Sequence, residues 1–354
     1  MKSVLYLKPT ISKRIFNKER LQEQTVIISN HTSFLDSLTI GMTYSKVVYI
    51  VNDWVYKSPV FGRAVKFLGF YPATKGVAQG LEPLEERLGT DFSVMIFPEG
   101  TRSYTSEINR FHKGAFFMAE ELQLPIQPVY IHGNADLLPK GDFIIYNAIC
   151  HVYVGTPIAL HDARFGTSYA ERTKKISKFF KEEYTKIRLK AEDADYFKEK
   201  LFLNYLYKEH GVLSKIKNDF KEHKSEYHRL FSLIDEKASI AHITSDFGQV
   251  DFLMVNQFPS RKITTFNIIA EHAAIAKASY ILNKFKLSYV DEVDAIWRNN
   301  SVLIISHLDN FSFQVPQQIK QIIVVCCTFN ATFTNFTLIE TKEKIKIYQR
   351  NETN

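Results

Sequence analysis

Residues Thr25–Asp36 read TVIISNHTSFLD, and they say more about the fold than any other stretch of the chain. They begin with a β-branched apolar run, which is typical of a buried strand. The polar residues that follow place His31 and Asp36 five positions apart, directly after that strand. A histidine oriented by a carboxylate can act as a general base towards a hydroxyl group. The pattern therefore predicts a strand followed by a loop that carries a possible general base.

The offset of five residues constrains how these two side chains can meet. It turns a regular helix through about 500°, so they would not share a helix face. They can meet only if the backbone turns between them, and we expect Thr32 or Ser33 to cap the helix that carries Asp36. An isolated pair of this spacing could equally be a surface histidine beside a capping aspartate. The neighbouring Asn30 and Phe34, after an apolar strand, favour a site.

A second stretch, Phe97–Ser103, reads FPEGTRS and follows the apolar run Ser93–Phe97. A proline ends that predicted strand, and Gly100 permits a sharp turn. Glu99 and Arg102 would then lie at the carboxyl end of a strand, where open α/β sheets bind ligands. The planar guanidinium of Arg102 suits phosphate, while Glu99 could accept a hydrogen bond from a substrate hydroxyl or hold Arg102. A purely structural Glu–Arg pair in a turn is the alternative.

Apolar runs alternate with helical patterns over the first half of the chain, which predicts an α/β sheet packed with helices. The predicted strands are Thr25–Ser29, Val47–Val51, Ser93–Phe97, Gln127–Ile131 and His151–Val154, and the predicted helices are Pro59–Leu68, Gly80–Leu88 and Lys113–Leu122. Tyr169–Lys190 has apolar residues at helical spacing among lysines, so it predicts an amphipathic helix with a basic face. Such a helix either lies on a membrane or packs on its own domain.

Composition narrows the class of protein. The chain has 354 residues, 45% of them hydrophobic, and a formal net charge of +7. That length suits two domains, and the charge suits an anionic membrane surface, nucleic acid or simply a mildly basic soluble protein. Three cysteines give no disulfide framework and no zinc spacing. Met1–Leu7 has too short an apolar core for a signal peptide, and no stretch is long enough to span a membrane, so we expect a soluble or peripheral protein.

The second half of the chain predicts another α/β series after a linker at Glu192–Asp195 and a charged helical region, Tyr196–Ile234. We therefore expect domains at 1–192 and 193–354. The predicted strands are Ser239–Thr244, Lys262–Ile268, Leu287–Val293, Val302–His307 and Ile322–Phe329; the predicted helices are Gln249–Gln257 and His272–Leu282; and Thr337–Thr341 with Lys344–Tyr348 predicts a hairpin. We interpret His210, His223 and His228 as surface residues and expect no metal site.

The first half resembles the glycerolipid acyltransferase family, which includes 1-acylglycerol-3-phosphate acyltransferases. Asn30–Asp36 (NHTSFLD) is similar to its first signature block and Phe97–Ser103 to its third. Leu68–Lys75 (LGFYPATK) resembles the second block and Leu124–Val129 (LPIQPV) the fourth. Phe111–Ala115 (FHKGA) matches a stretch that commonly follows the third block.

This resemblance implies roles for particular residues. It makes His31 the catalytic base and Asp36 its partner, while the acceptor's phosphate is bound by Lys75, Glu99, Gly100, Thr101 and Arg102. Lys75 stands where the family usually has arginine, so a point charge replaces a bidentate fork and the acceptor headgroup could differ. Fewer than 30 residues precede the first block, whereas family members often carry hydrophobic helices there, so we expect membrane attachment to come from elsewhere.

The second half resembles class I S-adenosylmethionine-dependent methyltransferases, with early helices, alternating strands and helices, and a terminal antiparallel hairpin. The family's glycine-rich loop is replaced by Thr244–Gln249 (TSDFGQ), and Asn267 stands where an acidic residue would bind the ribose. We interpret this domain as a degenerate Rossmann-like fold that does not bind S-adenosylmethionine, although Asp246 could serve a relic pocket. The tandem arrangement looks like the tail of certain large bacterial lipid-handling fusion proteins.

These observations predict an enzyme that transfers a fatty acyl group from acyl carrier protein or coenzyme A to the free hydroxyl of a lysophospholipid or related lysolipid. No cofactor beyond that acyl donor is expected. The expected location is the cytoplasmic face of the inner membrane, at an anionic surface, with no nucleic-acid partner. Methyl transfer by the second domain and a non-catalytic lipid-binding scaffold are the alternatives.

Overall fold

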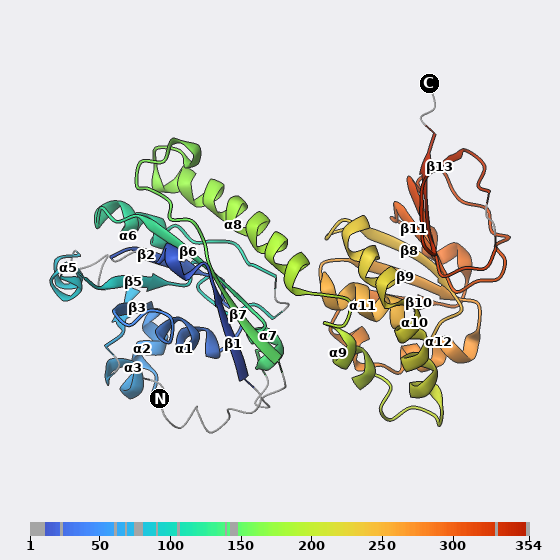
Figure 1. Ribbon diagram of the computed structural model, residues 1–354, viewed down its shortest axis with the longest axis horizontal. Coiled ribbons are helices and arrows are strands. Elements are labelled where there is room, and N and C mark those ends of the chain that lie inside the picture. The colour runs from blue at the N-terminus through green and yellow to red at the C-terminus, as the bar shows by residue number, and fades with distance from the viewer. Residues whose placement is uncertain are drawn as a thin grey trace. The chain divides into compact units, whose positions relative to one another are not determined.

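The structure is a computed structural model that describes residues 11–21, 24–59, 62–67, 69–73, 81–89, 91–104, 107–138, 140–141, 148–329 and 332–351. The chain divides into two compact units, Met1–Arg188 and Leu189–Asn354. Each unit contains one seven-stranded sheet with helices packed against it (Figure 1). The predicted fold class, two successive α/β domains, is confirmed.

The sheet of the first unit has the strand order β1-β7-β6-β2-β5-β3-β4. All neighbouring strands are parallel except β6 and β7, which are antiparallel. The strands are β1 (Ile11–Phe16), β2 (Val26–Ser29), β3 (Val47–Val51), β4 (Tyr71–Pro72), β5 (Ser93–Ile96), β6 (Ile126–His132) and β7 (Ala148–Val154). The helices are α1 (Leu35–Gly41), α2 (Asp53–Lys57), α3 (Gly62–Phe67), α5 (Glu82–Leu88), α6 (Gly114–Glu121), α7 (Asn134–Leu137) and α8 (Tyr169–Ala191), with 3₁₀ turns at Lys18–Arg20 and Ala163–Phe165.

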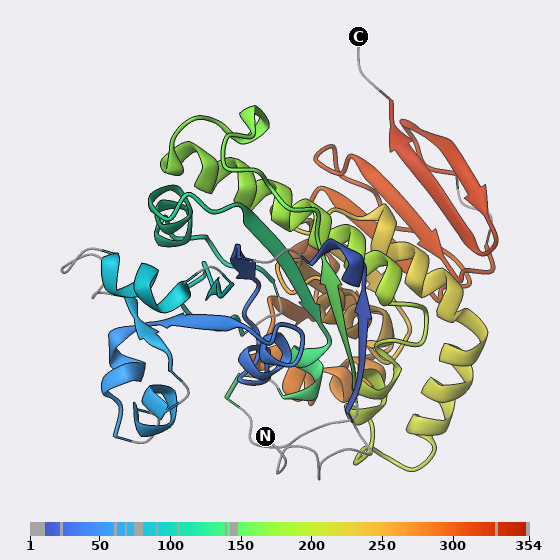
Figure 2. The ribbon, with the colours of Figure 1, turned by 60° about the vertical axis from the view of Figure 1, so that its left-hand side comes forward.

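Helices lie on both faces of this sheet (Figures 1 and 2), and an apolar layer covers each face. On one face, Val26 and Ile28 of β2 pack with buried residues of α5, α6 and α8. On the other face, Ile27 packs with Ile40 of α1 and with residues of β3, β6 and β7. The alternation along β2 follows from the two-residue period of a strand. Because β2 is central and buried on both faces, the loop that leaves it has a rigid base.

The amphipathic helix predicted at Tyr169–Lys190 is α8, and it packs on its own domain. Its buried apolar residues Ile176, Phe180 and Tyr184 belong to the same core as β2 and α6. Most of its lysines, including Lys174 and Lys178, are exposed, and Lys181 is half-buried. The apolar stripe is therefore used for folding, and the basic face remains outside.

Several short elements of the first unit differ from the prediction, among them β1, α2, α3 and β4. The strand β1 is not predicted, because Lys13 and Arg14 interrupt its apolar pattern; as an edge strand beside β7 it needs no continuous apolar run. The helix α2 and the strand β4 are also unpredicted. The predicted helix Pro59–Leu68 is shorter, since α3 covers only Gly62–Phe67.

The second unit begins with two helices and continues as a sheet of order β10-β9-β8-β11-β12-β14-β13. The helices are α9 (Lys198–Leu203), α10 (Val212–Leu233), α11 (Gln249–Gln257) and α12 (Ala270–Lys277), with 3₁₀ turns at Tyr280–Asn283 and Val293–Trp297. The strands are β8 (Ser239–Thr244), β9 (Lys262–Asn267), β10 (Leu287–Val290), β11 (Val302–Ser306), β12 (Gln321–Val325), β13 (Phe336–Lys342) and β14 (Ile345–Arg350).

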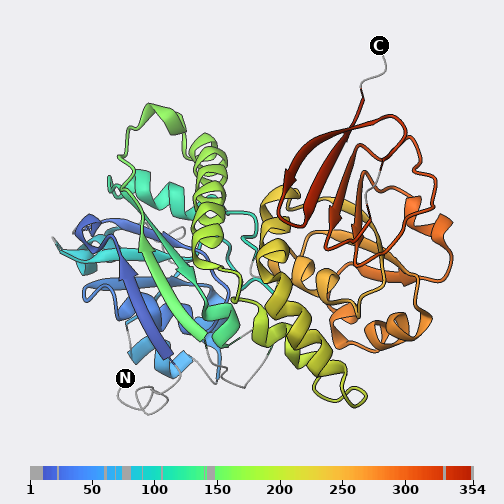
Figure 3. The ribbon, with the colours of Figure 1, turned by 45° about the vertical axis from the view of Figure 1, so that its right-hand side comes forward.

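The strand order confirms the Rossmann-like, methyltransferase-type fold predicted for this half. The five strands β8 to β12 are parallel, and the hairpin β13–β14 adds to β12 in the antiparallel sense (Figure 3). A sheet with its first strand in the middle places the ends of β8 and β11 side by side. Ligands of such sheets bind at this carboxyl edge, where the strand order reverses.

Candidate functional site

The loop of the first candidate site leaves the central strand β2 and is tied to the neighbouring strand β6. The side-chain amide of Asn30 donates to the Ile131 carbonyl at 2.8 Å and accepts from the Ile131 amide at 2.9 Å. Asn30 is fully buried, and buried polar groups need hydrogen-bond partners. These two bonds continue the link between the two strands beyond the end of their backbone pairing. The residue before His31 is thus held in a fixed position.

The structure brings His31 and Asp36 together. His31 Nδ1 lies 3.0 Å from Asp36 Oδ2, and Asp36 is fully buried. The same oxygen accepts from the backbone amides of Thr32 at 2.6 Å and Ser33 at 2.8 Å. The expectation that Thr32 or Ser33 caps α1 is confirmed for Ser33, whose hydroxyl accepts from the Leu35 amide at 3.2 Å, while the Asp36 carboxylate also binds the turn.

The second oxygen of Asp36 is bound by a residue that sequence reasoning missed. Asn134, at the start of α7, donates to Asp36 Oδ1 at 2.8 Å and to Thr39 Oγ1 at 3.0 Å. It is 98 positions from Asp36 in the sequence, and no local pattern links the two residues. With donors on both oxygens, the carboxylate stays in one orientation.

The His31 ring is fixed in plane and in tautomer. It stacks on Phe97 with ring centroids 4.0 Å apart and an interplanar angle of 14°. Because the carboxylate accepts, Nδ1 carries the proton in the neutral ring and Nε2 keeps a lone pair. No residue in the described part of the chain bonds Nε2, and the side chain is 18% exposed. The ring is therefore arranged to take a proton from a group outside the protein.

Glu99 joins the second stretch to the His31 loop. Its Oε1 accepts from the His31 backbone amide at 2.7 Å, and its Oε2 accepts from the Asn109 amide at 2.7 Å. The side chain is only 2% exposed, and within the described residues it makes no bond to Arg102. Both oxygens are therefore used to hold backbone, and a further bond joins the Ser103 amide to the His31 carbonyl at 2.7 Å.

We predict that the titration of Glu99 lowers stability as the pH rises. Burial raises the pKa of the Glu99 carboxyl from 4.5 to about 7, although the amides of Asn109 and His31 oppose the shift. The folded state then binds the proton more tightly than the unfolded chain. Its contribution to stability is complete below about pH 4.5 and is lost as the pH rises through about 7.

The measurement is urea unfolding of the wild type and Glu99→Gln at about pH 5 and about pH 8. The wild type should lose about 2 to 3 kcal/mol more than the variant between these values. The comparison uses the change with pH, so any constant loss in the variant cancels. Equal changes in the two proteins would rule out a raised pKa at Glu99.

Gly100, Thr101 and Arg102 form the turn beside the histidine. Gly100 has φ +67°, and an added Cβ would lie 3.2 Å from His112 Cδ2, so the turn requires glycine here. Thr101 is exposed and Arg102 is half-buried. The Arg102 guanidinium makes no hydrogen bond or ion pair with any residue the structure describes. Lys75, the other predicted cation, lies outside the described residues.

Lys140 adds a cation that the motifs do not contain. Its Nζ donates to the Arg102 carbonyl at 2.7 Å and lies 3.4 Å from Thr101 Oγ1 and 3.8 Å from the centre of the Tyr104 ring. Two positive side chains thus gather at one turn, a natural site for a phosphate group.

Two positions of the second unit that the methyltransferase resemblance assigns to S-adenosylmethionine are used within the protein. The loop glycine, Gly248, is used internally: an added Cβ would lie 2.6 Å from the Tyr289 hydroxyl oxygen and 2.9 Å from Ala276 Cβ. The side-chain amide of Asn267 is also occupied, because it donates to the Asp246 carbonyl at 2.6 Å and accepts from the Ile269 amide at 2.9 Å. Neither the loop nor the ribose position offers the groups that the fold family uses for this cofactor.

Comparisons with known proteins agree with the motifs of the first unit. Residues 13–132 match the family model described as Acyltransferase. The 1-acyl-sn-glycerol-3-phosphate acyltransferase BAT2, chloroplastic, of Brassica napus is 32% identical over 126 residues, which are 34% of this chain and 37% of that protein. The chain thus spans little more than a third of the length of this relative.

Two solved structures are similar in fold to parts of the chain. The 1-acyl-sn-glycerophosphate (LPA) acyltransferase PlsC from Thermotoga maritima has a TM-score of 0.44 at 20% identity, covering 53% of this chain and 76% of that chain. A methyltransferase from Geobacter sulfurreducens has a TM-score of 0.29 at 13% identity, covering 42% and 92%. At these scores we take the fold assignments from the strand orders alone.

The fold and the site define the first unit as an α/β domain with a histidine–carboxylate pair at the end of its central strand. The sequence of this unit is similar to the acyltransferase family over residues 13–132. No helix among the described residues is both long enough and apolar enough to cross a membrane.

Proposed function

We propose that the first domain, residues 1–192, is an O-acyltransferase that moves a fatty acyl group from a thioester to the free hydroxyl of a lysophospholipid. The observation that carries this proposal is the 3.0 Å contact between His31 Nδ1 and Asp36 Oδ2, which leaves Nε2 available. The match of residues 13–132 to the acyltransferase family supports it.

The chemistry follows from the tautomer of the ring. His31 Nε2 takes the proton of the acceptor hydroxyl as that oxygen attacks the thioester carbonyl carbon. The imidazolium that forms is stabilised by the Asp36 carboxylate. When the tetrahedral intermediate collapses, the carbon–sulfur bond breaks and the thiolate takes the proton back from Nε2. An ester and a free thiol result, and the histidine returns to its starting state.

We propose that Arg102 and Lys140 bind the acceptor's phosphate, with Gly100 and Thr101 shaping the turn and Lys75 contributing as the family resemblance implies. The free guanidinium of Arg102 supports this role. For Glu99 the hydrogen bonds support a positioning role, because both of its oxygens hold backbone amides. The Brassica napus relative, a 1-acyl-sn-glycerol-3-phosphate acyltransferase, supports 1-acylglycerol-3-phosphate as the acceptor class.

The donor and the location are further parts of the proposal. Either acyl carrier protein or coenzyme A supplies the thioester, and no other cofactor takes part. The exposed lysines of α8 support attachment to an anionic membrane surface, which we assign to the cytoplasmic face of the inner membrane of a bacterium. Nucleic acid is not proposed as a partner, because only the net charge of the chain supports it.

The full chain is tested with a labelled acyl donor and a panel of lysolipids and amino-acid lipids, followed by mass spectrometry of the products. We expect acylated product from lysophosphatidate with at least one of acyl carrier protein and coenzyme A as the carrier. Acylation of amino-acid lipids alone would overturn the phosphate assignment. Absence of any acyl product with either carrier would overturn the proposal itself.

Arg102→Ala should raise the KM for a phosphate-bearing acceptor about 10- to 100-fold and change kcat much less, because a charge-assisted bond to phosphate contributes about 1.5 to 3 kcal/mol. Initial rates at varied acceptor concentration measure this. Arg110→Ala, an exposed arginine eight residues later, is the matched control. Unchanged acceptor kinetics in Arg102→Ala would remove the residue from phosphate binding.

A further inference from the structure

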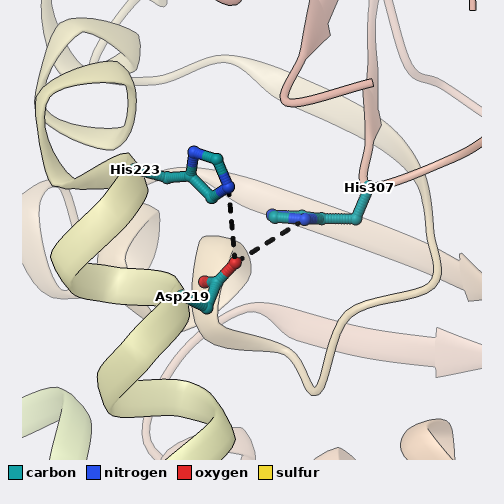
Figure 4. Close-up of side chains that lie close together, drawn as sticks. All are labelled: Asp219, His223 and His307. Carbon is teal, nitrogen blue, oxygen red and sulfur yellow. Dashed lines mark ion pairs between the residues drawn. The ribbon is translucent and has the colours of Figure 1, made fainter. Parts of the chain in front are cut away.

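Three potential metal ligands converge in the second unit, in a region the acyl-transfer chemistry does not use. Asp219 and His223 lie one turn apart on α10, and His307 directly follows β11 (Figure 4). One ligand atom from each lies within 4.8 Å of the other two. The expectation that His223 is a surface residue is wrong, since it is only 9% exposed. The fold has brought it to a histidine 84 positions further along the chain.

The distances do not suit hydrogen bonds. Asp219 Oδ1 lies 3.7 Å from His307 Nδ1 and 4.0 Å from His223 Nε2. Hydrogen bonds between nitrogen and oxygen are about 2.7 to 3.2 Å long. Two ligand atoms on one tetrahedral zinc ion are about 3.4 Å apart, given bond lengths of about 2.0 to 2.1 Å. The observed gap is therefore closer to that of a metal site than to that of a hydrogen-bonded pair.

A tyrosine orients two of the three ligands. The Tyr227 hydroxyl donates to Asp219 Oδ2 at 2.6 Å, and His307 Nε2 lies 2.7 Å from the same hydroxyl oxygen. Because that hydroxyl has a single proton, His307 must donate its Nε2 proton to the oxygen. In the neutral ring the lone pair of His307 Nδ1 then faces Oδ1 of Asp219, and no proton lies between these two atoms.

The Gln249 side chain completes this outer layer by donating to Asp219 Oδ2 at 3.0 Å. Metal-binding histidines and carboxylates usually have their remaining polar atoms bonded in this manner. Asp219 and His307 also line a cavity of about 350 Å³ at the carboxyl ends of β8 and β11. The three protein ligands would thus leave a coordination position open to that cavity, as in catalytic zinc sites.

Two positive side chains oppose a cation here: Lys215 lines the same cavity, and Lys344 contacts the His223 ring. Lys344 Nζ lies 3.4 Å from His223 Nδ1, while its main partner is Glu222 at 2.6 Å. An ammonium group can only donate, so this contact favours the His223 tautomer with its proton on Nε2. Metal binding requires Lys344 to leave the ring and keep Glu222. Removing the lysine charge should therefore strengthen the site.

We propose that Asp219, His223 and His307 form a binding site for a divalent transition-metal ion of the zinc class. Two neutral imidazoles and one carboxylate suit such an ion, whereas magnesium and calcium prefer oxygen ligands. The site belongs to the second unit and is independent of the proposed acyl transfer. The proposed ligand of this methyltransferase-like domain is therefore a metal ion and not S-adenosylmethionine.

The test uses the full chain, free of affinity tags and stripped with a chelator. Calorimetry with Zn²⁺ should show one equivalent bound. His307→Ala should weaken binding at least about 100-fold, since even changing a residue that only orients a metal ligand costs about 10- to 100-fold. His210→Ala, an exposed histidine of the same unit, is the matched control and should bind as the wild type does. No zinc binding, or equal affinity in the two variants, would overturn the proposal.

Two further variants keep the test decisive if His307→Ala fails to fold. Tyr227→Phe keeps the ring but removes the orienting hydroxyl, so it should weaken zinc binding about tenfold, and Lys344→Met should strengthen it about tenfold. Co²⁺ in place of Zn²⁺ should give the visible absorption of a tetrahedral site. A Co²⁺ spectrum identical to that of the free aqueous ion, or affinities unmoved in both variants, would contradict the assignment.

Discussion

His31→Ala should lower the rate of acyl transfer at least about 10³-fold, because no other described group is placed to take the proton of the acceptor hydroxyl. The ring stacks on Phe97 and bonds Asp36, so alanine leaves a gap open to solvent on one side and should not prevent folding. The measurement is the initial rate with saturating donor and acceptor. Circular dichroism on the same samples checks that the variant is folded.

His161→Ala provides the matched control. It is the same substitution, and His161 is an exposed residue of the same domain. It should keep the wild-type rate. Undiminished turnover in His31→Ala would remove the histidine from the mechanism. Binding of the acceptor should change far less than the rate, because the proposed phosphate contacts belong to other residues.

Asp36→Asn should lower kcat about 10³- to 10⁴-fold while keeping the size of the side chain. The carboxylate accepts from His31, Thr32 and Ser33 on one oxygen. An amide can present its oxygen to these donors or to Asn134, but not to both sides. If the oxygen faces Asn134, its NH2 group confronts the Thr32 and Ser33 amides and the ring loses the acceptor that fixes its tautomer.

The same substitution should also cost about 1 to 3 kcal/mol of stability, because it leaves buried donors unpaired. Urea unfolding measures this part, and rates are then compared at a temperature where both proteins are folded. Asp91→Asn, whose carboxylate pairs with Lys46 at the surface, is the control and should change neither quantity. A loss of rate fully explained by unfolding would reduce Asp36 to a structural residue.

Some elements could be predicted closely because they depend on local patterns. Val47–Val51, Ser239–Thr244 and Gln249–Gln257 have the same bounds in the sequence-based prediction and in the structure. Short, largely apolar runs in buried parallel strands and a clear helical segment leave few alternatives. By contrast, β1 carries Lys13 and Arg14, and its strand conformation depends on pairing with β7, more than 130 positions away. No local sequence pattern predicts that β7 is its partner.

The candidate sites divide in the same way. His31, Asp36 and Arg102 lie in short motifs next to strand ends, so their spacing and residue types were enough to single them out. Asn134, Lys140 and the backbone role of Glu99 depend on hydrogen bonds to residues up to 98 positions away. The burial of His223 was missed for the same reason, since its ring contacts His307 and Lys344, which lie 84 and 121 positions further along the chain.

The order of residues alone therefore determines the type of each domain and the identity of the histidine, because both follow from local periodicity and short-range chemistry. The folded chain alone decides which oxygen of Asp36 meets which donor, where the positive side chains gather and that Asp219 faces two imidazoles. These features depend on sheet pairing and helix packing over long separations, and burial makes each hydrogen bond within them obligatory.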